Sequence, residues 1–220
     1  GEIKMNIIAD NRLGLFALVA LTALTLFLYG QLPAEIPINF SISGESTEYL
    51  TKSIAAILIP GAYALTLILA NIIIAMSPEK FAMLRSKRAL DSMVFAIGVL
   101  MCFLQYAILL HAGEFEFFVR YFSLGTAIFL IIGGNVIGKI ERNFVIGLRF
   151  PWTMDSDAAW RHSHRAAGKS MVAAGVLLIL SNFFIVNLWI TVSLLAGSIA
   201  IPIFWFGIER KRNPEKWKEN

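Results

Sequence analysis

Residues 170–207 read SMVAAGVLLILSNFFIVNLWITVSLLAGSIAIPIFWFG, and this stretch contains no Asp, Glu, Lys or Arg. A helix needs about 20 apolar residues to cross the roughly 30 Å of hydrocarbon in a bilayer. The stretch is long enough for two such helices, and Asn187 near its middle is a suitable turn residue. We therefore predict membrane-spanning helices over 170–186 and 188–207, joined as a tight antiparallel hairpin.

Four further apolar runs precede this hairpin, and they predict helices over 13–29, 53–76, 92–112 and 117–138. The chain is 57% hydrophobic and 15% charged, whereas about a quarter of the residues in a soluble domain are charged. The first run lacks a small-residue cleavage site, so we expect a membrane span there and not a cleaved signal. The sequence therefore predicts an all-α fold, an integral membrane bundle of six transmembrane helices in the lipid bilayer.

The basic residues predict the orientation of the bundle. Seventeen of the 19 Lys and Arg residues lie before the first run, between the second and third, between the fourth and fifth, or after the sixth. Only Lys52 and Arg120 fall outside this set. Because short cytoplasmic connections are enriched in Lys and Arg, we predict that both termini are cytoplasmic. The net charge of +4 follows from this asymmetry and does not indicate direct nucleic-acid binding.

This topology divides the chain into six segments. They are a cytoplasmic N-terminus (1–12), helices one and two (13–76) with an outer loop (30–52), helices three and four (77–138), a cytoplasmic connection with an interfacial helix (139–169), the helical hairpin (170–208) and a basic cytoplasmic tail (209–220). Pro33 and Pro37 stiffen the start of the outer loop, and the Ser, Gly, Glu and Thr residues that follow favour turns.

The second half of the cytoplasmic connection has the pattern of a short helix. Asp155 is a suitable N-cap, and Asp157 in the first turn is favourable beside the helix dipole and four residues from Arg161. Trp160, His164 and Ala167 would share one face of this helix. We therefore predict a short interfacial helix at the membrane surface, with an Asp157–Arg161 ion pair.

The first half of the connection predicts a fixed loop. Gly147 permits an unusual backbone conformation, and Pro151 makes the preceding Phe150 extended. Trp152 favours the headgroup level, where it would pin the loop to the inner face together with Arg149. Two readings remain open: a membrane anchor, or a docking surface for a cytoplasmic partner, because aromatic and Arg side chains are frequent binding hot spots.

The sequence contains little that suggests catalysis or metal binding. His162 and His164 are two residues apart and would point to different sides of a helix, and the single Cys102 has no partner in the chain. No HExxH motif, phosphate-binding glycine loop or Ser-His-Asp arrangement occurs. We therefore expect no enzymatic activity, no cofactor and no metal.

Polar and small residues within the predicted spans indicate helix packing. Asn71 and Gln105 are expected to form interhelical hydrogen bonds, because an unpaired amide in hydrocarbon is unfavourable. Gly134 and Gly138 form a GxxxG motif, which lets two helix backbones approach closely. We expect this approach inside the bundle.

The inner stretch, GNVIGKIERNFVIGLRFPWTMDSDAAWRHSHRAAGK, resembles the signature of the SdpI family of bacterial membrane immunity proteins. The matching positions are Gly134-Asn135, Asn143-Phe144, Gly147, Arg149, Pro151-Trp152-Thr153, Trp160, His164-Arg165 and Gly168. The outer stretch, with Leu32-Pro33, Ile36-Pro37, Gly44 and Lys52 followed by Pro60, resembles the domain of unknown function that commonly precedes this region. That domain often has a His near the position of Asn39, so this chain departs from it there.

The resemblance implies a six-span protein that protects its host from a secreted peptide toxin. It also implies signalling, in which the toxin-engaged protein holds a winged-helix autorepressor at the membrane. The implied cytoplasmic partner-binding residues are Asn143, Gly147, Arg149, Pro151, Trp152, Thr153, Trp160, His164, Arg165 and Gly168. The candidates for an outer-loop ligand site are Pro33, Pro37, Asn39, Gly44 and Lys52.

Two alternatives from other functional classes stay open. A small multi-pass transporter or exporter of a peptide or lipid would depend on Asn71 or Gln105, with helices kinked at Pro60 and Pro202. A membrane-embedded enzyme would use His164 with Asp155 or Asp157 at the inner face.

Overall fold

The computed structural model of the chain describes residues 11–41, 45–76, 86–110, 114–143 and 147–217. Within these residues six helices are long and apolar enough to cross a membrane, so the predicted six-helix membrane bundle is confirmed. They are α2 (Arg12–Tyr29), α3 (Lys52–Met76), α4 (Lys87–Leu110), α5 (Phe115–Ile137), α7 (Asp157–Phe184) and α8 (Leu188–Arg212).

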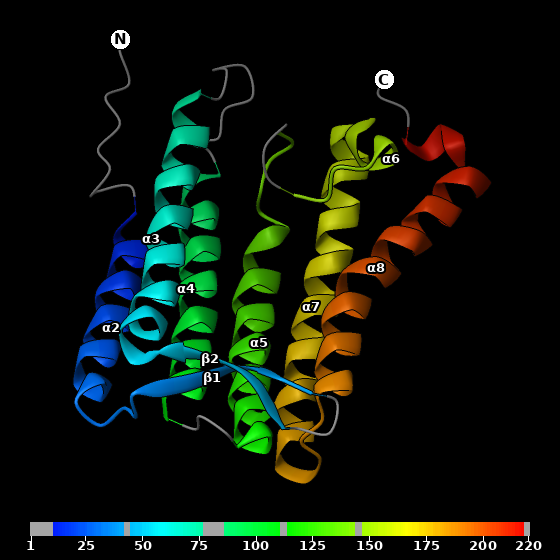
Figure 1. The fold of residues 1–220 in the computed structure, drawn as a ribbon. Coiled ribbons are helices and arrows are strands. Elements are labelled where there is room, and N and C mark those ends of the chain that lie inside the picture. Colours follow the sequence, from blue (N-terminus) through cyan, green and yellow to red (C-terminus); the bar gives the residue numbers. More distant parts are fainter. Residues whose placement is uncertain (1–10, 42–44, 77–85, 111–113, 144–146, 218–220) are drawn as a thin grey trace.

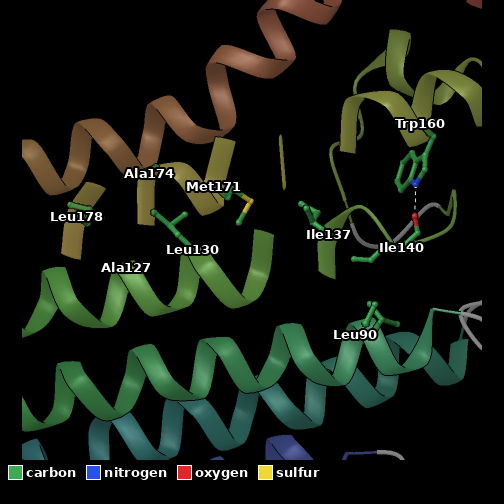
Figure 2. Close-up of a cluster of buried hydrophobic side chains, with 10 residues drawn as sticks. Leu90, Ala127, Leu130, Ile137, Ile140, Trp160, Met171, Ala174 and Leu178 are labelled. Atoms are coloured by element: carbon green, nitrogen blue, oxygen red, sulfur yellow. Dashed lines mark hydrogen bonds between the residues drawn. The ribbon is translucent and has the colours of Figure 1, made fainter. Parts of the chain in front are cut away.

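The six helices form two groups of three that meet along α4 and α5 (Figure 1). In the first group, α2, α3 and α4 pack around the buried Tyr63, whose hydroxyl donates to the carbonyl of Val94 at 3.0 Å. In the second group, α7 lies between α5 and α8. The largest apolar cluster joins the two groups through Leu90 of α4, Leu130 of α5 and Leu178 of α7 (Figure 2).

The hairpin turn between α7 and α8 lies at the predicted residue. The Asn187 side-chain oxygen accepts hydrogen bonds from the backbone N–H groups of Trp189 at 2.8 Å and Ile190 at 3.3 Å. This N-cap satisfies backbone donors that the first turn of a helix cannot pair internally. The prediction of a tight hairpin is confirmed.

A small antiparallel sheet, which the sequence analysis did not predict, lies in the segment expected to be an outer loop. Strand β1 (Glu35–Phe40) pairs with β2 (Ser46–Thr51), with Ile36 opposite Leu50. Ile36 is fully buried and packs against Leu28 of α2 and Leu109 of α4. The alternating apolar residues of β1 were the signal for a strand.

The sheet lies at the same end of the bundle as the α7–α8 turn (Figure 1). The start of α2, the end of α8 and the one-turn helix α6 (Pro151–Met154) lie at the opposite end. Below, the end that carries the sheet is called the sheet end, and the end that carries α6 is called the basic end.

The prediction of a separate interfacial helix is wrong. Residues 157–169 form the first turns of α7, which continues without a break to Phe184. Ser156, and not Asp155, is the N-cap, because its hydroxyl accepts from the Ala159 N–H at 3.1 Å. Ala166, Ala167, Lys169 and Met171 favour a helix on both sides of Gly168, and no proline interrupts the segment, so the helix continues.

The face shared by Trp160, His164 and Ala167 is also placed differently from the prediction. All three side chains are buried in the protein and do not face the membrane surface. Asp157 forms its ion pair with Arg142, which comes from the preceding connection, at 2.8 Å. The apolar face of this segment therefore packs against the chain's own loop.

The predicted interhelical contacts are present. Asn71 accepts a hydrogen bond from Asn11 at 2.7 Å, and Gln105 donates to Thr25 and to the Ala56 carbonyl at 3.2 Å each. The backbones of α5 and α7 meet at Gly134 and Gly168, described below. Both polar side chains thus connect helices of the first group.

Candidate functional site

The connection between α5 and α7 is folded over the first turns of α7, with Trp160 at its centre. The indole of Trp160 is 1% exposed, and its Nε1–H donates to the Ile140 carbonyl at 2.7 Å (Figure 2). Ile140 itself belongs to the largest apolar cluster of the bundle. The loop is thus an extension of the protein core at the basic end.

His164 joins the same loop to α7 through both of its ring nitrogens. Its Nδ1 lies 2.8 Å from the Trp160 carbonyl, which only accepts, and its Nε2 lies 2.9 Å from the backbone nitrogen of Leu148, which only donates. These two partners assign the neutral ring with the proton on Nδ1. The ring stacks on Trp160 with centroids 3.9 Å apart, so this histidine is used for structure.

Gly147 has the backbone conformation that the sequence analysis expected. Its φ is +123°, the only positive φ among the described residues. A Cβ built there would lie 2.5 Å from Nε2 of His164 and 2.7 Å from the Trp160 ring. Only glycine combines this conformation with so close an approach to the Trp160–His164 pair.

The short helix α6 is set by Pro151 and Thr153. Phe150 is extended, as predicted for a residue before proline, with φ −97° and ψ 154°. The buried Thr153 hydroxyl donates to the Leu148 carbonyl and accepts from the Phe150 N–H at 3.0 Å. The Leu148–Thr153 turn is therefore closed by a side chain.

Two ion pairs hold the connection to the helices around it. Arg142 contacts Asp157 at 2.8 Å and also donates to the Met154 carbonyl at 2.9 Å. Asp155 pairs with Arg210 near the end of α8. The connection is thus tied to both helices of the hairpin.

One edge of this structure is exposed at the basic end. Arg149 is exposed, and the Phe150 ring, 37% exposed, stacks on Trp152 with centroids 5.1 Å apart. Trp152 itself is half-buried against the cluster of Ala159, Phe206 and Trp217. The end of α8 covers part of the Trp152 ring, and its predicted place at the headgroup level stays a prediction.

The other predicted partner-binding residues lie in different surroundings. Asn143 is buried, and its amide donates to the Glu141 carbonyl at 2.8 Å. Arg165 and Gly168 lie on the flank of α7 that faces α5, beside a groove between these two helices. Phe144 is outside the described residues.

The predicted outer-loop residues are at the sheet end. Pro33 and Asn39 are exposed, whereas Pro37 is buried opposite Tyr49 in the sheet. The Lys52 ammonium lies 4.9 Å from the centroid of the Tyr29 ring. Gly44 is outside the described residues. The two groups of candidate residues thus lie at opposite ends of the bundle.

Sequence reasoning missed three groups that complete the site at the basic end. They are the Ile140 carbonyl, the Arg142 side chain and Ser86, whose hydroxyl accepts from the Glu141 N–H at 2.8 Å. Arg142 entered the sequence analysis only as one of many basic residues. Backbone carbonyls carry no sequence signal at all.

The geometry gives the enzyme hypothesis no support. His164 is fully buried and bonded to backbone groups, while Asp155 and Asp157 pair with Arg210 and Arg142. In the described part of the chain, no three His, Cys, Asp or Glu side chains are grouped as metal ligands.

Comparisons with known proteins agree with this arrangement. A family model described as the SdpI/YfhL protein family matches residues 139–207, and one described as a domain of unknown function (DUF1648) matches residues 16–64. The immunity protein SdpI of Bacillus subtilis (strain 168) is 32% identical over 186 residues, which cover 82% of this chain and 83% of that protein. This chain belongs to the SdpI family. It is a multi-pass protein of the cell membrane.

The two matched regions correspond to different parts of the fold. The SdpI/YfhL region contains the α5–α7 connection, α7 and most of α8, and the DUF1648 region contains most of α2, the sheet and the first half of α3. No solved structure matches the chain.

Proposed function

We propose that this chain is an immunity protein that protects its host from a secreted peptide toxin. The observation that carries this proposal is its 32% identity to the immunity protein SdpI over most of both chains. The test is expression in a toxin-sensitive host, with survival measured against toxin concentration. We expect the survival curve to shift to higher toxin concentrations, and a curve equal to that of the empty vector would remove the immunity role.

We further propose that the toxin is engaged at the sheet end, which the predicted topology places outside the cell. Ile38 and Tyr49 of the sheet expose 38% and 55% of their surface, and exposed apolar side chains are suited to contacts with a peptide. Asn39 and Pro33 are exposed beside them. Replacing Tyr49 by Ala should reduce survival at an unchanged protein level, whereas the control Ile68→Ala, which is exposed on α3 away from the sheet, should not.

At the basic end, we propose that Arg149 and Phe150 contact a cytoplasmic transcriptional repressor and hold it at the membrane. Both are exposed on a turn that hydrogen bonds with Thr153 and His164 hold in place, and a preorganised surface loses less entropy on binding. Among the other predicted residues, Pro151 belongs to the same turn, Gly147 lies against Trp160 and His164, and Trp152 stacks on Phe150.

The repressor part has its own test. The chain is purified from detergent-solubilised membranes with and without toxin, and bound proteins are identified by mass spectrometry. A DNA-binding protein recovered in a toxin-dependent way is expected, and Arg149→Ala should reduce its recovery more than the control Arg212→Ala. If full survival persists while no such protein is recovered, the chain confers immunity without signalling.

The transporter alternative receives no specific support. Asn71 and Gln105, on which it depended, are buried and hydrogen-bonded to other helices.

A further inference from the structure

A groove of about 650 Å³ lies on the flank of the bundle, between the end of α5 and residues 165–173 of α7. Lys139, Arg165 and Lys169 line it, and no carboxylate does. All three cations are exposed. The stem of Arg165 lies over Gly138, where a Cβ would be 3.3 Å from its Cγ. The groove is therefore a concentrated positive site.

Glycines shape the floor of the groove. A Cβ on Gly134 would lie 2.6 Å from the carbonyl oxygen of Gly168, and a Cβ on Gly168 would lie 2.5 Å from that of Gly134. The two backbones are thus in direct contact, and neither residue has a side chain to fill the space beside them. The groove therefore results from the close crossing of α5 and α7 at these two glycines.

The position of the groove along α7 places it at the edge of the hydrocarbon. Fifteen residues separate Lys169 from Phe184 at the other end of the helix, which is about 22 Å at 1.5 Å per residue. A bilayer core is about 30 Å thick, so the Lys169 backbone lies inside it when Phe184 is at the far edge. The long Lys and Arg side chains can extend from this depth to the phosphate level.

An apolar track leads from the groove toward the centre of the membrane. Val172 lines the groove, and Val176 and Leu180 follow at intervals of four residues on the same face of α7. Val176 and Leu180 are 45% and 51% exposed. The positive charge of the groove next to the exposed apolar side chains of Val176 and Leu180 suits a molecule that has an anionic head and a hydrocarbon tail.

We propose that this groove is a binding site for an anionic phospholipid. The lipid phosphate lies among Lys139, Arg165 and Lys169, and one acyl chain follows Val176 and Leu180. Basic pockets between transmembrane helices are suited to anionic headgroups because a phosphate there is both paired and partly desolvated. The depth of Lys169 favours a lipid over an acidic soluble protein, which cannot enter the hydrocarbon. This site does not depend on the immunity role.

Native mass spectrometry of the detergent-purified full chain tests the proposal, with phosphatidylglycerol and phosphatidylcholine of identical acyl chains as probes. We expect tighter binding of phosphatidylglycerol. The variant Arg165→Ala/Lys169→Ala should lose about fivefold in affinity for each cation removed. The charge-matched control Lys211→Ala/Arg212→Ala, whose residues are exposed at the end of α8 and do not line the groove, should keep its affinity.

Three results would overturn the assignment. They are equal affinity of the unmodified chain for the two lipids, an equal loss in the control variant, and full competition by free glycerol phosphate, which would indicate a phosphate site without a role for the acyl chain. The conservative variant Arg165→Lys/Lys169→Arg keeps both charges, so it should bind like the original chain. Because the comparison of the two lipids needs no substitution, the proposal is tested even if the alanine variant does not fold.

Discussion

At the scale of single residues, the family signature of this chain is mainly a packing arrangement. Trp160 and His164 are buried, and their polar atoms are used on the backbone of the loop that covers them. Because Gly147 has no side chain, its backbone can lie directly against both rings. The signature residues that are exposed at the basic end, such as Arg149, are therefore the ones that another molecule can reach.

Replacing Gly147 by Ala should destabilise the protein by about 1–3 kcal/mol, because Ala is strained at φ +123° and its Cβ would press on His164 and Trp160. The measurement is the unfolding midpoint in detergent. Gly30→Ala is the matched control, since its backbone is right-handed helical and a Cβ there meets nothing within 4 Å. Equal midpoints for the two variants would contradict the strained geometry.

Replacing Trp160 by Phe should lower the free energy of unfolding by about 1–3 kcal/mol. The change removes the Nε1–H donor and leaves the buried Ile140 carbonyl without that bond, while most of the ring packing is kept. Chemical denaturation in detergent would measure the difference. The control is Trp189→Phe, which is 72% exposed and should change stability little. A comparable effect of both substitutions would show that the Trp160 hydrogen bond is not decisive.

At the scale of elements, α7 connects the signature to the membrane. It has 28 residues, so it is about 42 Å long and exceeds the hydrocarbon thickness by roughly two turns. The extra turns carry Trp160 and His164, and the same rigid helix continues to the α8 hairpin. A change in the packing of α5 against α7 would therefore also move the loop at the basic end.

Substituting Ala for Gly134 or Gly168 should weaken the packing of α5 on α7. The new Cβ would lie 2.6 or 2.5 Å from a backbone oxygen of the other helix, so the helices must separate. We expect each variant to lose about 1–3 kcal/mol of stability. Unfolding in detergent can be compared with Gly197→Ala, where a Cβ would meet only Ile201 at 3.5 Å. Unchanged stability in both interface variants would mean that α5 and α7 lie farther apart.

At the scale of the whole molecule, the fold places two surfaces at opposite ends of helices that are long enough to cross a membrane. The sheet lies at one end of the bundle, and both ends of the described chain lie with α6 at the other (Figure 1). The two groups of helices meet through α4 and α5, so the part that carries the sheet is packed directly on the part that carries the signature. This contact is the physical connection between the two proposed binding surfaces.

The charge distribution predicts which end is cytoplasmic, and cysteine labelling can measure it. In a Cys102→Ala background, Glu45→Cys at the sheet end should react with a membrane-impermeant maleimide in intact cells. Lys211→Cys at the basic end should react only after the membrane is opened. The reverse pattern would place Arg149 and Phe150 outside the cell and end the repressor proposal.

The membrane class, the six helices and the α7–α8 turn could be predicted from the sequence. Each depends on a local property: a run of apolar residues long enough to cross the bilayer, or a capping side chain next to the residues it caps. The extended Phe150 and the unusual backbone of Gly147 were predictable for the same reason, since proline and glycine act on their own dihedral angles.

The surroundings of the signature were decided only by tertiary structure. Trp160 and His164 have the helical spacing of a membrane-surface face, yet they are buried because Ile140, Gly147 and Leu148 of the preceding connection lie against them. The partner of Asp157 is Arg142 and not the nearby Arg161, because the fold of the connection brings that guanidinium to the start of α7. A hydrophobic pattern indicates that one face of a helix is buried. Which segment buries it depends on contacts between residues that are distant in the chain.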